Sequence, residues 1–437
     1  MKKRKLKNKV VVHLILLNML LFVFLLGLVY KNRMIEIAER YIIGESLYIV
    51  FNDKVSCYLD DEWTDTNEDN ALIINLSDAT DKLKVKSSSG VVYTLNNDLS
   101  FADGIKFDSF DIYLAKGDAE SISCYAPDNT MITYESDNDS IASVDENGII
   151  YGNNNGKTAI RIKVNDLIYM IDVTVTDLIV PVSSEFDYNK PFITPDLYTE
   201  EENDLIDEIL AFRIEKVGYK TRAAAVEAAR FLALEFPYRI HYFTENGRID
   251  SYIGIYCDGE GRYYHKGLYL DESRYSLLNS DLISDTPSTW GEIVYDYTND
   301  QYWPNGLDCS GFVSWCLLQA GYDPGDLGAG IAEWEDLSDL GPLSNLRNSL
   351  DEIRVGDLLV GGEDPIEGGH IAMLAGKKDG YFYVAESQQT SEYYWGYCIR
   401  KYSAEELLEY FFYWEDMSGY YQEDGDISDY WLDQYPS

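Results

Sequence analysis

The residue with the clearest potential for chemistry is Cys309, which begins an apolar segment. Apolar residues between Phe312 and Leu318 would cover every side of a helix that Gly321 ends, so the sequence predicts a helix buried in a core. Cys309 would then lie at the helix N-terminus, where the helix dipole and free backbone N–H groups stabilise a thiolate. This position predicts a cysteine nucleophile, and the alternative is an inert buried cysteine.

A cysteine nucleophile needs a base, and three histidines lie outside the apolar N-terminal segment. His241 and His265 fall in a Tyr-, Gly- and Asp-rich stretch at 238–303, which predicts an insertion with irregular structure. His370 instead begins an apolar strand that stops at a turn after Gly376. We therefore expect His370 to be the general base.

The third member of the site depends on the turn after this strand. A five-residue loop centred on Lys378 would pair His370 with Glu386 on the next strand. Directly opposed Cβ atoms lie about 4.5–5.5 Å apart, so the carboxylate could hold the imidazole by its second nitrogen. A two-residue turn at 379–380 would instead oppose His370 to Gln389. Loop length decides between these two residues.

Three motifs surround these positions: Asp308-Cys-Ser-Gly, then Val355-Gly-Asp-Leu-Leu-Val, then Gly369-His-Ile-Ala-Met-Leu-Ala-Gly. In their order and spacing, over about 305–390, the chain resembles the NlpC family of bacterial cell-wall cysteine peptidases. The resemblance implies a reduced papain-like fold of the α+β class, which would include a helix at 221–236.

The same resemblance implies roles for individual residues. Cys309 would be the nucleophile, His370 the general base and Glu386 the polar third residue. Asp308 and Ser310 match family positions that shape the substrate pocket. The implied reaction is hydrolysis of peptide bonds in peptidoglycan stem peptides, without a cofactor.

One part of the family pattern is not found in the chain. The family has Tyr-x-Trp-Gly-Gly shortly before the cysteine, whereas Tyr302-Trp-Pro-Asn-Gly stands nearby here. We expect the insertion at 238–303 either to reposition the usual tyrosine or to replace it.

Two helices are predicted to begin the catalytic domain, which we place at 199–437. The first follows the N-cap candidate Thr199, and the second runs over 221–236, from its N-cap Thr221 to the proline at 237. The alanine-rich face of the second helix suits close packing.

The part of the chain before a linker at 178–198 predicts antiparallel β structure, because short alternating strands are separated by Gly, Asn and Asp turns. Residues 45–107 would form a small β region of unknown type. Residues 108–177, with Tyr134-Glu-Ser-Asp-Asn-Asp-Ser-Ile-Ala-Ser-Val-Asp-Glu-Asn-Gly and a closing Val173-Thr-Val, resemble the group 2 bacterial immunoglobulin-like domain, a β-sandwich. Such modules are spacers or binders on bacterial surface proteins.

The N-terminus predicts a membrane anchor. Six basic residues in a cytoplasmic segment, 1–9, precede a 21-residue apolar run at 10–30. At about 1.5 Å per residue this run could cross a bilayer core of about 30 Å. No small-residue cleavage site follows it, and the excess of positive charge before it places the N-terminus inside the cell. We expect a single-pass protein of the bacterial cell membrane with residues 31–437 outside.

Composition excludes several other classes of protein. The 437 residues include 35 Lys and Arg against 76 Asp and Glu, a formal charge of −41, and no local basic face for a nucleic acid is found. Six dispersed cysteines do not suggest a disulfide framework, and four histidines give no pair at metal-ligand spacing. We expect neither a nucleic-acid partner nor a metal.

The predicted fold class is multidomain: an N-terminal transmembrane helix, an immunoglobulin-like β-sandwich module, and an α+β reduced papain-like catalytic domain. The function favoured is a membrane-anchored endopeptidase that cleaves peptidoglycan stem peptides. Two alternatives remain open. One is an amidase or acyltransferase that uses the same Cys–His pair, and the other is a noncatalytic surface adhesin or scaffold.

Overall fold

The computed structural model describes residues 35–59, 61–80, 82–97, 105–127, 130–164, 167–182, 190–243, 290–296, 301–322, 324, 341–364, 368–389, 394–425, 427 and 432. The predicted basic segment 1–9 and membrane anchor 10–30 lie outside these ranges, so the location of the protein stays a prediction. Among the helices that the structure describes, none is long and apolar enough to cross a membrane. The chain divides into two compact units, Met1–Val175 and Thr176–Ser437.

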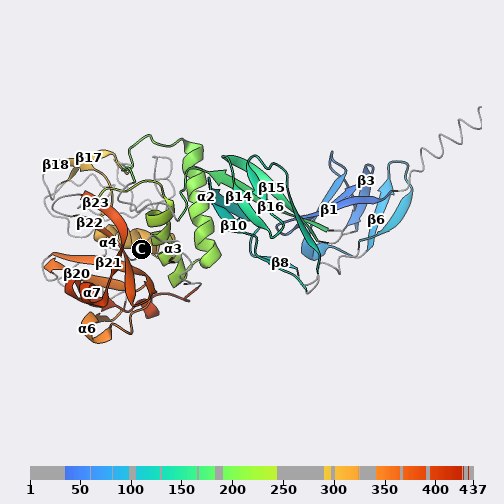
Figure 1. Ribbon diagram of the computed structural model, residues 1–437. Helices are drawn as coiled ribbons and strands as arrows, with labels where there is room; N and C mark the ends of the chain where they lie inside the picture. The colour runs from blue at the N-terminus through green and yellow to red at the C-terminus, as the bar shows by residue number, and fades with distance from the viewer. Residues whose placement is uncertain are drawn as a thin grey trace, which may run out of the picture. The chain divides into compact units, whose positions relative to one another are not determined.

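The first unit is built from β-strands (Figure 1). Its seven-stranded sheet has the order β12-β15-β16-β1-β2-β5, and β9 also pairs with β16. Smaller sheets have the orders β4-β3-β6-β7, β10-β14-β13 and β11-β8. The bounds are β1 (Ile37–Ile43), β2 (Ser46–Phe51), β3 (Val55–Leu59), β4 (Glu62–Asp65), β5 (Ala71–Asn75), β6 (Lys82–Ser87), β7 (Val92–Asn96), β8 (Lys106–Phe107), β9 (Asp111–Ala115), β10 (Ala119–Ser121), β11 (Cys124–Tyr125), β12 (Ile132–Ser136), β13 (Ala142–Val144), β14 (Ile149–Gly152), β15 (Gly156–Val164) and β16 (Leu167–Thr176).

Alternating side chains explain these strands. In β2, Leu47, Ile49 and Phe51 are buried, while the residues between them are partly exposed. Strand β1 lies between β2, to which it is antiparallel, and β16, to which it is parallel. The regions predicted at 45–107 and 108–177 therefore contribute strands to one sheet and share one hydrophobic core. The domain boundaries predicted within this unit stay predictions.

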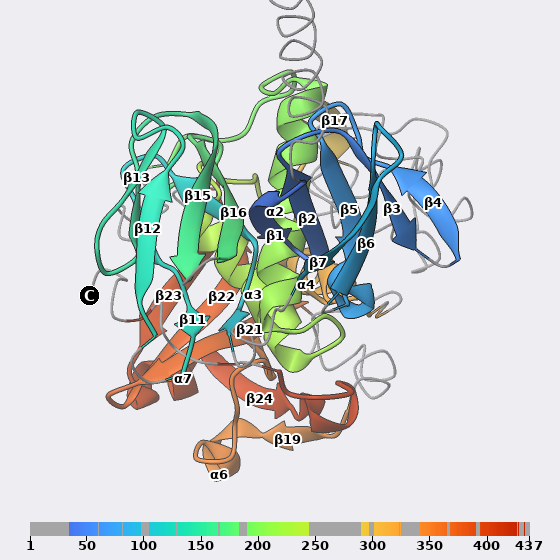
Figure 2. The ribbon, with the colours of Figure 1, turned by 90° about the vertical axis from the view of Figure 1, so that its right-hand side faces the viewer.

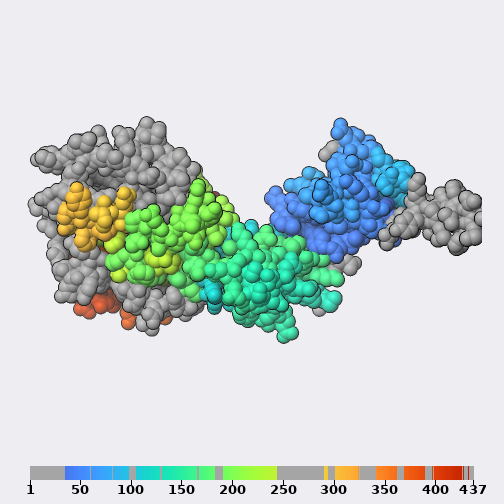
Figure 3. All heavy atoms as spheres, turned by 90° about the horizontal axis from the view of Figure 1, so that it is seen from above, coloured from blue at the N-terminus to red at the C-terminus, as the bar shows by residue number. Residues whose placement is uncertain are grey.

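The second unit contains a six-stranded sheet in the order β19-β24-β20-β21-β22-β23, in which every neighbouring pair is antiparallel. Its strands are β19 (Leu343–Asn345), β20 (Leu358–Asp364), β21 (Gly368–Lys378), β22 (Tyr381–Gln389), β23 (Tyr394–Tyr402) and β24 (Phe411–Glu415). A separate pair, β17 (Ile293–Asp296) and β18 (Gln301–Pro304), overlaps the stretch predicted to be irregular. This pair lies at the surface, where Ile293 is 59% and Tyr302 71% exposed (Figure 3).

Helices α3 and α4 pack on this sheet: α3 contacts β21, and α4 contacts β21 and β22 (Figure 2). The helices of this unit are α2 (Glu200–Val217), α3 (Arg222–Arg230) with a π-helical turn (Phe231–Glu235), α4 (Cys309–Gln319), α6 (Leu346–Ser349) and α7 (Ala404–Tyr410). The predicted N-caps Thr199 and Thr221 are confirmed, since each side chain accepts a hydrogen bond from the first turn of its helix. The alanine-rich helix α3 is buried along its whole length.

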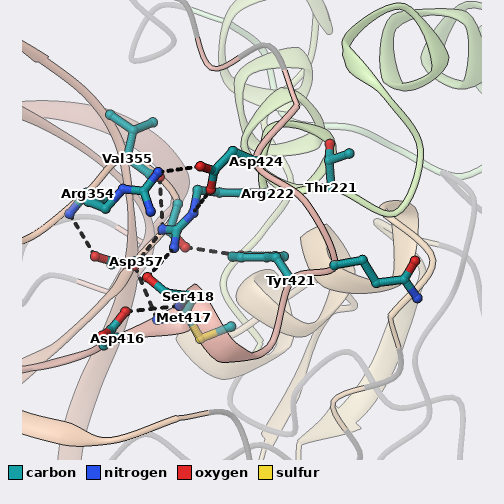
Figure 4. A network of polar contacts seen from close by, with 12 residues as sticks. Thr221, Arg222, Arg354, Val355, Asp357, Asp416, Met417, Ser418, Tyr421 and Asp424 are labelled. Atoms are coloured by element: carbon teal, nitrogen blue, oxygen red, sulfur yellow. Dashed lines mark hydrogen bonds and ion pairs between the residues drawn. The ribbon is translucent and has the colours of Figure 1, made fainter.

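A buried arginine joins α3 to the start of β20 (Figure 4). Arg222 Nη1 donates to Asp357 Oδ1 at 2.5 Å and to the Val355 carbonyl at 3.2 Å, and Nη2 donates to Ser418 Oγ at 3.0 Å. Burial raises the pKa of Asp357, while Arg222 opposes this effect. Gly356, which lies between Val355 and Asp357 in the chain, has a φ of 91°. A Cβ at this position would lie 2.5 Å from Arg222 Cγ. The Val355-Gly-Asp motif is therefore explained by this structural contact.

The predicted fold class is wrong. Strands hold 44% of the described residues and helices 21%, so the described chain is mainly β rather than a β-module followed by an α+β papain-like domain. The physical reason is that the apolar runs after residue 340 form long strands of one antiparallel sheet, while the predicted helices at 199–236 and 309–319 form but hold a smaller share of the described residues.

The same sheet contains a buried acid that makes stability depend on pH. Glu415 on β24 is fully buried, and this burial, together with the charge of Asp416, raises its pKa to about 8. The pKa of Glu415 is higher in the folded than in the unfolded state, so protonated Glu415 favours the folded state. This contribution to the free energy of unfolding is complete in acid and is lost as pH rises through 8. We expect Glu415→Gln to raise the thermal midpoint by several degrees at pH 9 and to change it little at pH 5.

Differential scanning fluorimetry at the two pH values tests this expectation. The control is Glu409→Gln, which removes an exposed carboxylate nearby on α7. Equal shifts for the two variants would show that burial of Glu415 does not set the pH dependence.

Candidate active site

Cys309 is the first residue of α4 and is 5% exposed, as predicted for the start of a buried helix. The helix begins there because Asp308 is its N-cap: the carboxylate accepts a hydrogen bond from the backbone N–H of Gly311 at 2.7 Å. The Ser310 hydroxyl donates to the same carboxylate at 3.2 Å. Asp308 and Ser310 thus order the turn that carries the thiol, and their part in a substrate pocket stays a prediction.

His370 lies on β21 and Glu386 on β22, and their side chains are hydrogen-bonded, with His370 Nε2 2.7 Å from Glu386 Oε2. The Glu386 carboxylate is fully buried. Its second oxygen accepts a hydrogen bond from the Tyr402 hydroxyl at 2.8 Å and lies 3.5 Å from Arg400 Nε. Both oxygens are therefore fixed, and one of them holds the imidazole in place.

The ionisation states of His370 and Glu386 depend on each other and on Cys309. Burial acts to lower the pKa of His370, but hydrogen bonds to Cys309 and Glu386 and the charges of both raise it to about 10. Burial acts to raise the pKa of Glu386, and His370 and Arg400 outweigh it, so that this pKa is lowered. At neutral pH the pair is imidazolium and carboxylate. Because Nε2 faces Glu386, Nδ1 is the ring nitrogen left for the Cys309 thiol.

Two aromatic rings, one at the end of α7 and one at the start of β24, lie against the imidazole. The rings of Tyr410 and Phe411 lie 5.8 and 5.9 Å from the His370 ring, centroid to centroid. The Gln388 side chain donates a hydrogen bond to the Tyr410 hydroxyl. These contacts limit rotation of the histidine about its side-chain bonds.

The strand register predicted for His370 and Glu386 is wrong, although the two side chains meet. The turn is the two-residue one at 379–380, and the ladder shifts by one residue between Leu374 and Gly376. Beyond this bulge Met373 pairs with Ala385. Continuing that register places Glu386 diagonally from His370 on the same face, within reach of a long side chain. The side chain of the alternative residue, Gln389, lies outside the described part of the structure.

Sequence reasoning missed Tyr242, which lies close enough to Cys309 for the thiol to affect the pKa of its hydroxyl. Burial, followed by the charge of Cys309, raises the pKa of Tyr242 well above its usual range, so the hydroxyl keeps its proton. Tyr302, which stands nearer to the cysteine in sequence, is 71% exposed on β18.

Two glycines bring Tyr242 to the thiol. The backbone of 240–242 passes beside Gly306, with which it forms a parallel β-bridge, and beside Gly396. A Cβ at either glycine would overlap a carbonyl oxygen of this segment. Gly306, two residues before Asp308, was therefore the signal of a closely packed backbone, but the sequence did not identify the segment that packs against it.

The other candidate base among the described residues, His241, has a different environment. Its ring stacks on Phe192 with centroids 4.1 Å apart, and burial lowers its pKa to about 4. His265 lies outside the described residues. Within the described ranges, no group of three or more His, Cys, Asp or Glu side chains could hold a metal ion.

Comparison with known proteins does not identify a family. No family model and no curated protein matches the chain. Among solved structures, the chain is similar to domains 4 and 5 of the S-layer protein SbsC, at 20% identity over 22% of this chain and 65% of that one, with a TM-score of 0.15. It is also similar to the N-terminal Ig1-2 module of the Drosophila receptor protein tyrosine phosphatase DLAR, at 9% identity over 33% and 100% of the two chains, with a TM-score of 0.22.

A third similar structure is the C-terminal 282-residue fragment of intimin in complex with the intimin-binding domain of its translocated receptor, at 15% identity over 46% and 78% of the two chains, with a TM-score of 0.16. The chain spans just under two thirds of the SbsC fragment. TM-scores this low carry no argument about function, and these three structures are not NlpC-type peptidases.

Proposed function

We propose that the second unit is a thiol hydrolase that cleaves peptide bonds in peptidoglycan stem peptides. The observation that carries the proposal is the grouping of Cys309, His370 and Glu386: the imidazole is hydrogen-bonded to Glu386 at 2.7 Å, and Cys309 lies close enough to raise the pKa of His370 together with Glu386. A nucleophile at a helix start, a buried histidine and an orienting carboxylate have the arrangement expected for covalent catalysis. The choice of substrate is supported by the three motifs that resemble the NlpC family.

In the first half of the reaction, the Cys309 thiolate attacks the carbonyl carbon of the scissile bond. The imidazolium of His370 gives its proton to the leaving amine, the C–N bond breaks, and an acyl thioester remains. Backbone N–H groups in the first turn of α4 and the Tyr242 hydroxyl lie at Cys309 and can stabilise the oxyanion.

In the second half, His370 is neutral and takes a proton from water. The hydroxide attacks the thioester, the C–S bond breaks, and the acid product leaves with the thiolate restored. Throughout both steps, Glu386 keeps Nδ1 of His370 directed to the reacting atoms and stabilises the imidazolium whenever it forms.

Digestion of purified peptidoglycan by the full-length protein tests the proposal. We expect new amino termini within the stem peptide, identified by mass spectrometry, and none with Cys309→Ala. Release of intact stem peptides from the glycan would instead indicate an amidase. Absence of any product, with Cys309 unreactive to an alkylating probe, would favour the noncatalytic alternative.

A further inference from the structure

The bulge in β21 lies between the turn and the catalytic histidine. On the turn side, Gly376 pairs with Tyr383, whereas on the site side Leu374 pairs with Val384. Ala375 between them has no opposing residue of its own, so β21 contains one residue more than β22 over this stretch.

This extra residue decides which face Glu386 occupies. Successive side chains of a strand point to opposite faces, so a shift of one residue moves a whole strand segment to the other face. If the register at Gly376 continued without the bulge, His370 would oppose Gln389, and Glu386 would lie on the opposite face. With the bulge, Glu386 is on the face of His370, in agreement with the 2.7 Å hydrogen bond.

A buried arginine from α3 holds the bulge. Arg230 is 3% exposed, and its Nε and Nη2 both donate to the carbonyl of Ala375, at 3.2 and 2.8 Å. A bulge disrupts the ladder and leaves backbone groups that need other partners when they are buried. Arg230 supplies two charged donors at this carbonyl.

We infer that Arg230 is a positioning residue for the Cys309–His370 pair: by holding the Ala375 carbonyl, it maintains the strand register that brings Glu386 to His370. This inference rests on the proposed function of the site. Arg230 acts through the backbone of β21, because it donates two hydrogen bonds to the Ala375 carbonyl, five residues along the strand from His370.

The competing explanation is that Arg230 only joins α3 to the sheet. Arg222 provides the matched control, because it is also buried, lies on the same helix and binds backbone and side-chain oxygens near β20. A purely structural arginine should change stability without changing the titration of His370. The test therefore needs a readout of the histidine itself.

The experiment follows the titration of the His370 imidazole by NMR in the full-length protein with isotope-labelled histidine, together with kcat/KM. In Arg230→Met we expect the pKa of His370 to fall by about one unit or more, because the carboxylate is no longer held beside it. We expect kcat/KM to fall about tenfold. Arg222→Met should lower the thermal midpoint and leave the His370 titration as in the wild type.

Deletion of Ala375 provides the rescue. Without Ala375, Leu374 directly precedes Gly376, so the pairing of Gly376 with Tyr383 is followed by the pairing of Leu374 with Val384 in a regular ladder. Glu386 then lies on the face of His370 without a bulge. Arg230→Met combined with this deletion should restore the His370 titration to within about half a unit of the wild type.

A folded Arg230→Met protein with an unchanged His370 titration would overturn the inference. If Arg230→Met does not fold, the double variant decides: a folded protein with the wild-type titration supports the inference, and an unfolded protein or a lowered pKa of His370 overturns it. The titration needs no substrate, so failure of the wild type to digest peptidoglycan would refute the proposed function without deciding this point.

Discussion

Cys309→Ala is expected to reduce turnover of peptidoglycan by at least about 10⁴-fold, to the background rate. No other described cysteine lies at the start of a helix beside His370, and the reaction cannot form a thioester without the Cys309 sulfur. His370→Ala should cost about as much, because it removes the group that protonates the leaving amine. The release of new amino termini, measured over time by mass spectrometry, gives the rates.

Cys316→Ala is the matched control for the nucleophile. Cys316 lies two turns further along α4, is fully buried, and burial raises the pKa of its thiol well above the usual range. Removing it should leave the rate unchanged and lower the free energy of unfolding by about 1–2 kcal/mol, since a small cavity remains in the core. Cys309→Ala should change the thermal midpoint little. Activity that followed Cys316 instead would refute the assignment.

Local sequence patterns predicted the parts of the site that depend on one element. The apolar run after Cys309 and the N-cap residue before it were enough to place the thiol at the start of α4. The position of His370 on a strand before a tight turn was predicted in the same way. Each of these conclusions depends on helix or strand periodicity within about ten residues.

The features that depend on contacts distant in sequence could not be predicted. The bulge at Ala375 is stabilised by Arg230, which lies 145 positions earlier in the chain, so turn length alone gave the wrong register. Tyr242 reaches Cys309 because two distant glycines admit its backbone. The fold class failed for a related reason: the helical patterns do form helices, but the pairing of strands distant in sequence places more of the described chain in antiparallel sheets.

Glu386→Gln is expected to lower kcat/KM about 10- to 100-fold and to leave a measurable rate. The lowered pKa of Glu386 means that the substitution removes a full negative charge, whereas the amide can still form a hydrogen bond to the imidazole. In the wild type, activity should fall above about pH 10, where His370 loses the proton that the leaving amine needs. This fall in activity is the upper limb of the pH–activity profile. Without the carboxylate, the upper limb should move to lower pH by about one to three units.

Two further variants decide whether the charge of Glu386 is responsible. Tyr402→Phe removes one hydrogen bond to the carboxylate but keeps its charge, so the upper limb should move by about half a unit or less. Gln389→Ala tests the residue that the alternative register favours. An unaffected Glu386→Gln beside a strongly impaired Gln389→Ala would transfer the orienting role to Gln389. A reduced rate in Glu386→Gln with an unmoved upper limb would show that this carboxylate supports the fold of the site and does not set the pKa of His370.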